Sequence, residues 1–310
     1  MDLQLTSDQH ALMAAVDRLC QPYELKPSEF QGFALVGEGL EKELEAGDYF
    51  EIASVPEMGP LAAAMVVERL ARLPYTVEAA ASMLVRPQLP GKWPRPLAVI
   101  ESARPGRFVA QARTILLIEG ESTSVVRTER GDAEPVESLF AYPMGRLNGS
   151  PKAVQLAPAE SANVRKWLRI ALAAESSGLM QAAIATAVEH LTLRRQFGRP
   201  LGAFQALHHR MAECAVLAGG VRWLMLKAAG TGDAGDAALA ALHAQESATR
   251  LVYDVHQMLA AMGITLEHSL HLWTYRLKSL QSDLGGRGGQ GRAVARYCFN
   301  APREGRDGAV

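Results

Sequence analysis

The residue types best suited to chemistry in this chain lie within residues 194–209, which read RRQFGRPLGAFQALHH. An arginine, a glutamine and a phenylalanine stand there at fixed distances from a Gly-Arg-Pro-Leu break, where we expect the chain to turn sharply. The segment opens with basic residues and is predicted to become helical again after the break. It is therefore suited to present a cation, an aromatic face and an amide to a dinucleotide.

Helices on both sides of the break must hold these side chains in place. We predict a long helix that is capped by Ser161 and runs towards His190, followed by a second helix over about residues 204–229. A loop and two further helices are then expected at about residues 231–236, 237–261 and 266–284. Four long helices joined by short loops predict a helical bundle.

The front of the chain reads as helices followed by short strands. Ser7 is expected to cap the first of four helical pieces, which cover about residues 8–20, 38–45, 59–73 and 77–85. Four prolines between residues 87 and 96 then mark a linker. Runs rich in β-forming residues follow at 97–101, 107–110, 114–119, 124–128 and 154–156.

This order of elements predicts an α+β fold that is mostly α. We expect a reduced N-terminal helical domain over residues 1–88, a small β-domain over 89–157 and a C-terminal four-helix bundle domain over 158–310. The sequence shows no internal repeat with a period of 20 to 50 residues.

Composition excludes several classes of function. The chain has 310 residues with 32 basic and 33 acidic side chains, so no basic excess is available to hold a nucleic acid. No apolar stretch approaches the roughly 18 residues of a membrane span, and no secretory signal opens the chain. The three cysteines form no CxxC pair, so we expect a reducing cytoplasm and neither disulfides nor a thiolate metal site.

The segment around residue 197 resembles the R-x-Q-F-G-x-P-L-x-x-F-Q signature of the acyl-CoA dehydrogenase family. Residues 174–183 look like the family helix that precedes this signature, and residues 257–268 are similar to its Q-I-H-G-G-x-G-F-T-x-E-H segment. The resemblance covers most of residues 165–285, and the order of predicted domains is that of the family. It implies an acyl-CoA dehydrogenase-like fold.

The resemblance also implies an FAD that is shared at a subunit interface. By position in the signature, Arg194, Gln196, Phe197 and Gln205 would bind the ADP half of an FAD that sits mainly in a neighbouring subunit, and Gln257 would be a further contact. The chemistry of these side chains fits this role, because a guanidinium fits a pyrophosphate, a phenyl ring can stack on adenine and an amide can donate to a phosphate or ribose oxygen. The family's Gly-Gly pair is replaced by alanines at residues 260–261, and we expect their methyl groups to crowd the cofactor.

The expected catalytic base is missing from both of its family positions. The family uses a glutamate to abstract the α-proton of the substrate, and alignment places Leu168 and Leu284 at the two positions from which it can come. Leucine cannot accept a proton. Glu175, two helical turns after Leu168, is an alternative base. The front of the chain is also short for the family, and residues 90–157 contain no counterpart of its T-E-x-x-x-G-S flavin motif.

The resemblance therefore implies a base-lacking subunit of a heteromeric, cytoplasmic acyl-CoA dehydrogenase. Such short subunits occur in bacterial α2β2 heterotetramers that oxidise bulky CoA thioesters, including steroid side chains. The implied partners are an acyl-CoA substrate, a homologous subunit and an electron-accepting flavoprotein. Two alternatives stay open: a self-sufficient homo-oligomer with an unaligned base, and a non-enzymatic stabilising partner.

Two further motifs are interpreted as structural. Residues 286–291 match GxGxxG, but they follow a predicted helix rather than a strand, so we expect a flexible loop. Glu267, His268 and His271 form E-H-x-x-H, with both histidines on a predicted helix. The sequence suggests no third ligand, so we expect helix packing and no metal.

Overall fold

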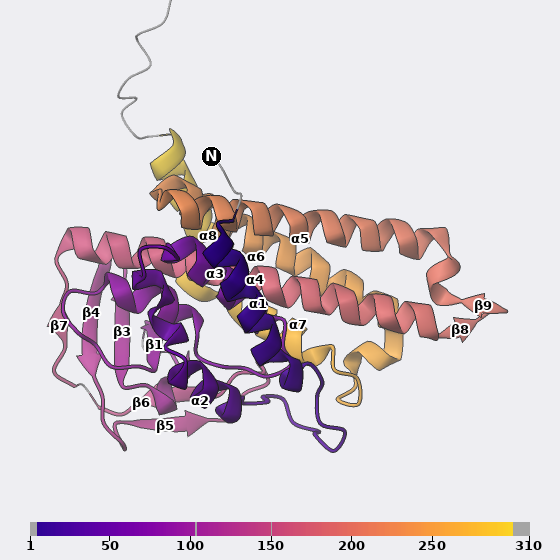
Figure 1. The fold of residues 1–310 in the computed structure, drawn as a ribbon, viewed down its shortest axis with the longest axis horizontal. Coiled ribbons are helices and arrows are strands. Elements are labelled where there is room, and N and C mark those ends of the chain that lie inside the picture. The colour runs from indigo at the N-terminus through magenta and orange to yellow at the C-terminus, as the bar shows by residue number, and fades with distance from the viewer. Residues whose placement is uncertain (1–4, 103, 150, 300–310) are drawn as a thin grey trace, which may run out of the picture.

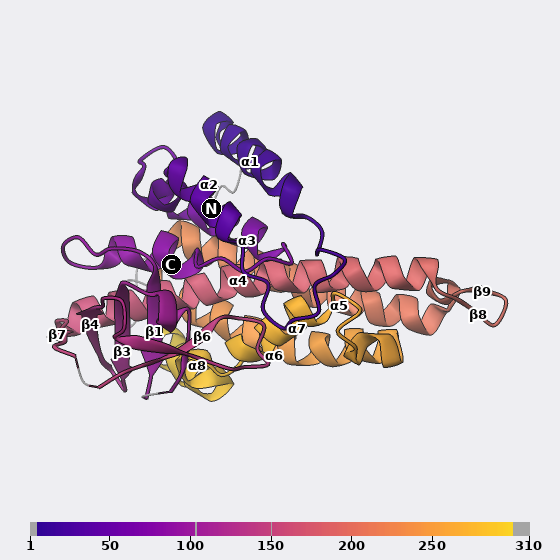
Figure 2. The ribbon, with the colours of Figure 1, turned by 90° about the horizontal axis from the view of Figure 1, so that it is seen from below.

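A computed structural model describes residues 5–102, 104–149 and 151–299 of the chain. As predicted, it is mostly helical and carries small sheets. Long helices run side by side along the molecule, the strands gather at one end of them, and the N-terminal helices cover one side (Figures 1 and 2).

The N-terminal part contains α1 (Ser7–Cys20), α2 (Glu38–Ala46) and α3 (Gly59–Ala71). The prediction that Ser7 caps the first helix was wrong. Thr6 is the cap, because its side chain accepts from the Gln9 backbone while the Gln9 side chain accepts from the Thr6 backbone. Most of α3 is buried, so this helix anchors the N-terminal part on the bundle.

Two small sheets follow. The first has the order β1-β3-β4-β7, formed by Leu97–Glu101, Thr114–Glu119, Ser122–Arg127 and Val154–Gln155. The second has the order β2-β6-β5, formed by Gly106–Arg107, Met144–Leu147 and Ala133–Val136. In these two sheets β1 and β3 pair in parallel, and the other neighbouring strands pair antiparallel.

The sheet prediction needed two corrections. The strand expected at 107–110 ends after Arg107, because Phe108 takes a left-handed conformation (φ 61°) and a short 3-10 turn follows it at Val109–Gln111. The strands β5 and β6 were missed. β5 contains Pro135, whose ring removes a backbone donor and weakens the strand signal in the sequence.

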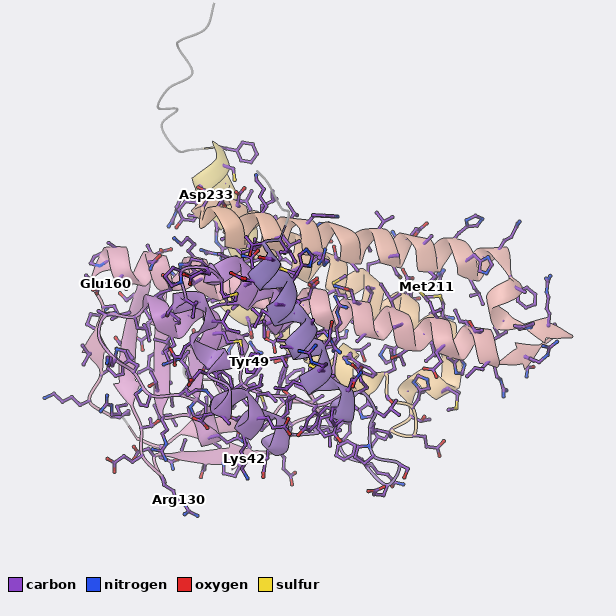
Figure 3. All side chains as sticks on the ribbon, in the orientation of Figure 1. Lys42, Tyr49, Arg130, Glu160, Met211 and Asp233 are labelled. Carbon is purple, nitrogen blue, oxygen red and sulfur yellow. The ribbon has the colours of Figure 1, made fainter. Side chains whose placement is uncertain are left out.

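The bundle is built from α4 (Pro158–Leu193), α5 (Gln205–Thr231), α6 (Ala234–Leu259) and α7 (His271–Leu280). The prediction that Ser161 caps α4 was wrong, because α4 begins at Pro158 and Ser161 is buried in its first turn. At the start of this helix the Glu160 carboxylate accepts a hydrogen bond from the Ala157 backbone N–H. α5 runs back from the far end past Met211, and the following turn brings the chain to Asp233 near the sheets (Figure 3). Asp233 caps α6, so the loop predicted at 231–236 ends earlier than expected.

The glycine-rich segment after α7 is a helix, so the predicted flexible loop was wrong. Leu284, Gly285 and Gly286 all have positive φ angles and turn the chain, and α8 (Gly286–Val294) then packs on α6. Gln290 stabilises this helix from inside the protein, where its side chain accepts from Arg169 and donates to the Leu284 carbonyl.

One continuous core joins the N-terminal helices, the first sheet and the bundle. α3 and α4 cross very closely at Gly178, where an added Cβ would lie 2.1 Å from the Glu68 carbonyl oxygen. The Glu68 carboxylate accepts from Ser177 at 2.6 Å and pairs with Arg222 of α5 at 3.2 Å. The division into three domains at residues 88/89 and 157/158 stays a prediction.

Candidate functional site

A pocket of about 430 Å³ lies where the three parts of the chain meet. Its walls come from the segment before β1, from β1 and β2, from α4 and from the end of α7. Leu168 of α4 and Leu284, which follows α7, both line it. The fold therefore brings the two expected base positions to one cavity, and neither side chain can accept a proton.

A buried ionic cluster lies at the same pocket around Glu175. The Tyr142 hydroxyl donates to one carboxylate oxygen of Glu175 at 2.6 Å, and Arg107 donates to the other at 2.9 Å. Arg107 also donates to Asp283 at 3.0 Å. Two carboxylates, one guanidinium and one phenol thus join β2, the β5–β6 connection, α4 and the segment after α7.

This cluster has a defined charge state. Burial lowers the pKa of Arg107, but the charges of Glu175 and Asp283 outweigh it, so that pKa lies well above its usual value. Burial and the negative charge of Glu175 raise the pKa of Tyr142 well above its usual value. Arg107 is therefore charged and Tyr142 neutral near pH 7, and both donate to Glu175, which leaves that carboxylate poorly suited to act as a base.

Glu101 is a further carboxylate at this pocket. It accepts a hydrogen bond from the Leu284 backbone N–H. Burial is the main cause that raises its pKa, and the nearby charge of Asp283 adds to it. Sequence analysis missed Glu101, Arg107, Tyr142 and Asp283, because they come from separate elements and no local motif links them.

The segment predicted to bind a dinucleotide forms a hairpin, which projects from the end of the bundle opposite to the sheets (Figure 1). β8 (Arg195–Gln196) and β9 (Arg199–Pro200) are joined by Phe197 and Gly198, with φ angles of 52° and 78°. Two positive φ angles are typical of a type I′ turn. Phenylalanine is strained there, yet its side chain is 87% exposed, so the turn holds an aromatic ring out in solvent.

The fold brings the predicted cofactor residues to one end of the molecule. Arg194, Gln196, Phe197 and Gln205 lie on or next to the hairpin, and Gln257 lies near the end of α6, which finishes on the same side (Figure 1). All five are exposed in the single chain. From Glu175 to Arg194 the distance along α4 is about 28 Å, at 1.5 Å per residue.

The alanine that replaces a family glycine has a glycine-like backbone. Ala260 follows α6 with φ 50° and ψ −131°, a region that side chains other than glycine rarely occupy. The glycine conformation is thus kept while the methyl group is added.

The histidine motif serves packing in this structure. His268 precedes α7 rather than lying on it, and His271 is its first residue, so the two do not share a helix as predicted. The His271 ring contacts the carbonyl oxygens of His268 at 2.8 Å and Gly32 at 3.1 Å. Within the described residues no group of three or more His, Cys, Asp or Glu side chains could hold a metal, and no helix there is long and apolar enough to cross a membrane.

Comparisons with known proteins show what the chain is similar to. Residues 164–297 match the family model described as acyl-CoA dehydrogenase, C-terminal domain. The chain is 32% identical over 162 residues to acyl-CoA dehydrogenase IpdE2 of Mycobacterium tuberculosis, covering 52% of this chain and 50% of that protein. It is 30% identical over 163 residues to acyl-CoA dehydrogenase FadE34 of the same organism, covering 50% of this chain and 23% of that protein. The matched part thus spans half or less of each relative's length.

Solved structures show the same fold. A chain of the ChsE4-ChsE5 complex from Mycobacterium tuberculosis matches with a TM-score of 0.78 at 18% identity, covering 97% of this chain and 100% of that one. Butyryl-CoA dehydrogenase from Megasphaera elsdenii matches with a TM-score of 0.72 at 16% identity, covering 95% and 99% of the two chains. The predicted acyl-CoA dehydrogenase-like fold is confirmed, and residues 164–297 are identified as similar to the C-terminal domain of the acyl-CoA dehydrogenase family.

Proposed function

We propose that this chain is a subunit of an FAD-dependent acyl-CoA dehydrogenase that oxidises the α,β bond of a CoA thioester, and that it binds the ADP half of an FAD held mainly by a partner subunit. The observation that carries the proposal is the exposed hairpin. Its strained turn presents Phe197 to solvent, about 28 Å along α4 from this chain's own pocket. A side chain so placed is suited to a ligand that belongs to another subunit.

The hairpin residues fit the ADP half of FAD. Arg194 would pair with the diphosphate, Phe197 would face the adenine, and the carboxamides of Gln196, Gln205 and Gln257 would hydrogen-bond phosphate or ribose oxygens. FAD supplies the acceptor for the hydride that leaves the β-carbon. The methyl groups of Ala260 and Ala261 depart from this fit, because these residues stand where the family resemblance expects a Gly-Gly pair.

The proposal assigns the catalytic base to the partner. Leu168 and Leu284 line this chain's pocket, and Glu175 is held by Arg107 and Tyr142. A homologous subunit with an intact glutamate would complete the site. Similarity in fold to a chain of the ChsE4-ChsE5 complex and to the Tcur3481-Tcur3483 steroid acyl-CoA dehydrogenase supports a heteromer that acts on a bulky acyl-CoA such as a steroid side chain. An electron-accepting flavoprotein is part of the same proposal.

One observation favours a second candidate, a self-sufficient homo-oligomer. The Glu101 carboxylate lines the pocket, its pKa is raised mainly by burial, and no described residue forms an ion pair with it, so it is a carboxylate that could accept a proton there. Turnover of an acyl-CoA by the purified chain alone would support this candidate.

The hairpin assignment is tested by changing Arg194 to Ala and measuring flavin content. The variant complex should lose FAD, because one bidentate contact to the diphosphate disappears. Arg195→Ala is the matched control, since this neighbouring arginine is also exposed but lies outside the predicted set. Full flavin occupancy in Arg194→Ala would overturn the assignment.

A further inference from the structure

The pocket beside Leu168 has an uneven charge. Much of its wall is apolar, with Leu97, Phe108 and Leu172 among the lining side chains. Five carboxylates also line it, from Glu78, Glu101, Glu137, Glu175 and Asp283. Among the described residues, two cations line it, from Arg104 and Arg107.

Among the described residues that line the pocket, the one interior cation is Arg107, and it is already paired with carboxylates. Arg107 is paired with Glu175 at 2.9 Å and with Asp283 at 3.0 Å, so its donors face two protein carboxylates rather than the cavity. Arg104 is exposed to solvent, which screens its charge. Among the described residues that line the pocket, no unpaired interior guanidinium is left for an anion that entered it.

Glu101 makes the cavity unfavourable for a second negative charge. Its carboxylate is held by the Leu284 backbone N–H, and no arginine or lysine of the described chain forms an ion pair with it. Burial and then the charge of Asp283 raise the pKa of Glu101, while the Leu284 and Gly285 N–H groups and the charge of Arg104 lower it. A ligand carboxylate placed here would be desolvated beside Glu101, which has no counter-ion among the described residues, and beside Asp283, whose counter-ion Arg107 is shared with Glu175, and this is costly.

We infer that this pocket selects uncharged, apolar acyl groups and rejects acyl groups that end in a carboxylate, and that Glu101 and Asp283 set this selectivity. The inference rests on the proposed function only in taking CoA thioesters as the ligands. It requires no chemistry at the pocket, so it holds for a chain that binds an acyl group without a base.

Two thioesters that differ only at the far end of the acyl chain test this inference. The CoA thioesters of octanoic acid and octanedioic acid would be titrated into the full chain by calorimetry near neutral pH. The octanoyl ester should bind about tenfold more tightly or better, since only the octanedioyl ester carries a terminal charge. Glu101→Gln keeps a carbonyl oxygen for the Leu284 N–H, and it should reduce this preference by about threefold or more.

The matched control is Glu137→Gln, because Glu137 lines the same pocket but is exposed and screened. It should leave the preference nearly unchanged. Leu168→Trp fills the cavity and should weaken octanoyl binding, which locates the binding site. Equal affinity for the two esters, an unchanged preference in Glu101→Gln or no binding of either ester would overturn the inference. Flavin content is measured separately, so failure of the hairpin assignment would remain distinguishable.

Discussion

Replacement of Arg107 by Met should destabilise the fold strongly. Arg107 is the shared counter-ion of Glu175 and Asp283, and Glu175 is only 8% exposed. Removing one partner from a buried ion pair leaves charge uncompensated and typically costs about 3–5 kcal/mol. Methionine keeps much of the side-chain volume, so the loss of stability would result from the unpaired carboxylates rather than from a cavity. We therefore expect the free energy of unfolding to fall by about 3 kcal/mol or more.

The loss of stability in Arg107→Met should depend on pH. Burial raises the pKa of Asp283, while Arg107 lowers it. Without Arg107 the pKa of Asp283 must rise further, so its protonated form becomes easier to populate in the folded protein. An acid whose pKa is higher in the folded than in the unfolded protein lowers the free energy of unfolding when it is ionised. The difference in free energy of unfolding between the original protein and Arg107→Met should therefore become smaller as the pH falls from about 8 to about 5.5.

Chemical denaturation followed by circular dichroism at both pH values would measure this effect. Arg146→Met is the matched control, because Arg146 is an exposed arginine on β6 and should change the free energy of unfolding by about 0.5 kcal/mol at most. A loss below about 1 kcal/mol in Arg107→Met, or a loss that does not depend on pH, would refute the reasoning.

Two other substitutions test the backbone geometry. Ala260→Gly should raise the free energy of unfolding by about 1 kcal/mol, because the strain at φ 50° and ψ −131° exceeds the added unfolded-state entropy of glycine; a lower melting temperature would contradict it. Gly178→Ala should lower the free energy of unfolding by about 3 kcal/mol or more, because its Cβ would lie 2.1 Å from the Glu68 carbonyl oxygen. Gly219→Ala is its matched control, since an added Cβ meets nothing within 4 Å there, and equal stability of the two variants would show that the α3–α4 crossing can adjust.

Sequence patterns predicted most of the bundle, because long apolar helices carry a strong periodic signal. α5 and α6 begin and end within a few residues of their predicted positions. α8 was missed because glycine disfavours a helix when judged alone, whereas here Gln290 and packing on α6 hold it.

The two halves of the candidate site differ in how far the sequence reveals them. The hairpin is one continuous segment, so its residues could be named from a signature, although the strained turn at Phe197 could not. The pocket cluster joins Arg107, Tyr142, Glu175 and Asp283 across long stretches of chain. Only tertiary packing brings them together, and of these four only Glu175 was named in advance.

The most direct test of the shared cofactor site is an absorbance spectrum. The chain would be purified alone and after co-expression with a homologous acyl-CoA dehydrogenase that retains its glutamate. Flavin bands in the complex and none in the chain alone are the predicted result, because the exposed hairpin supplies only the ADP contacts. Full flavin occupancy in the chain alone would contradict the shared site and favour a self-sufficient homo-oligomer.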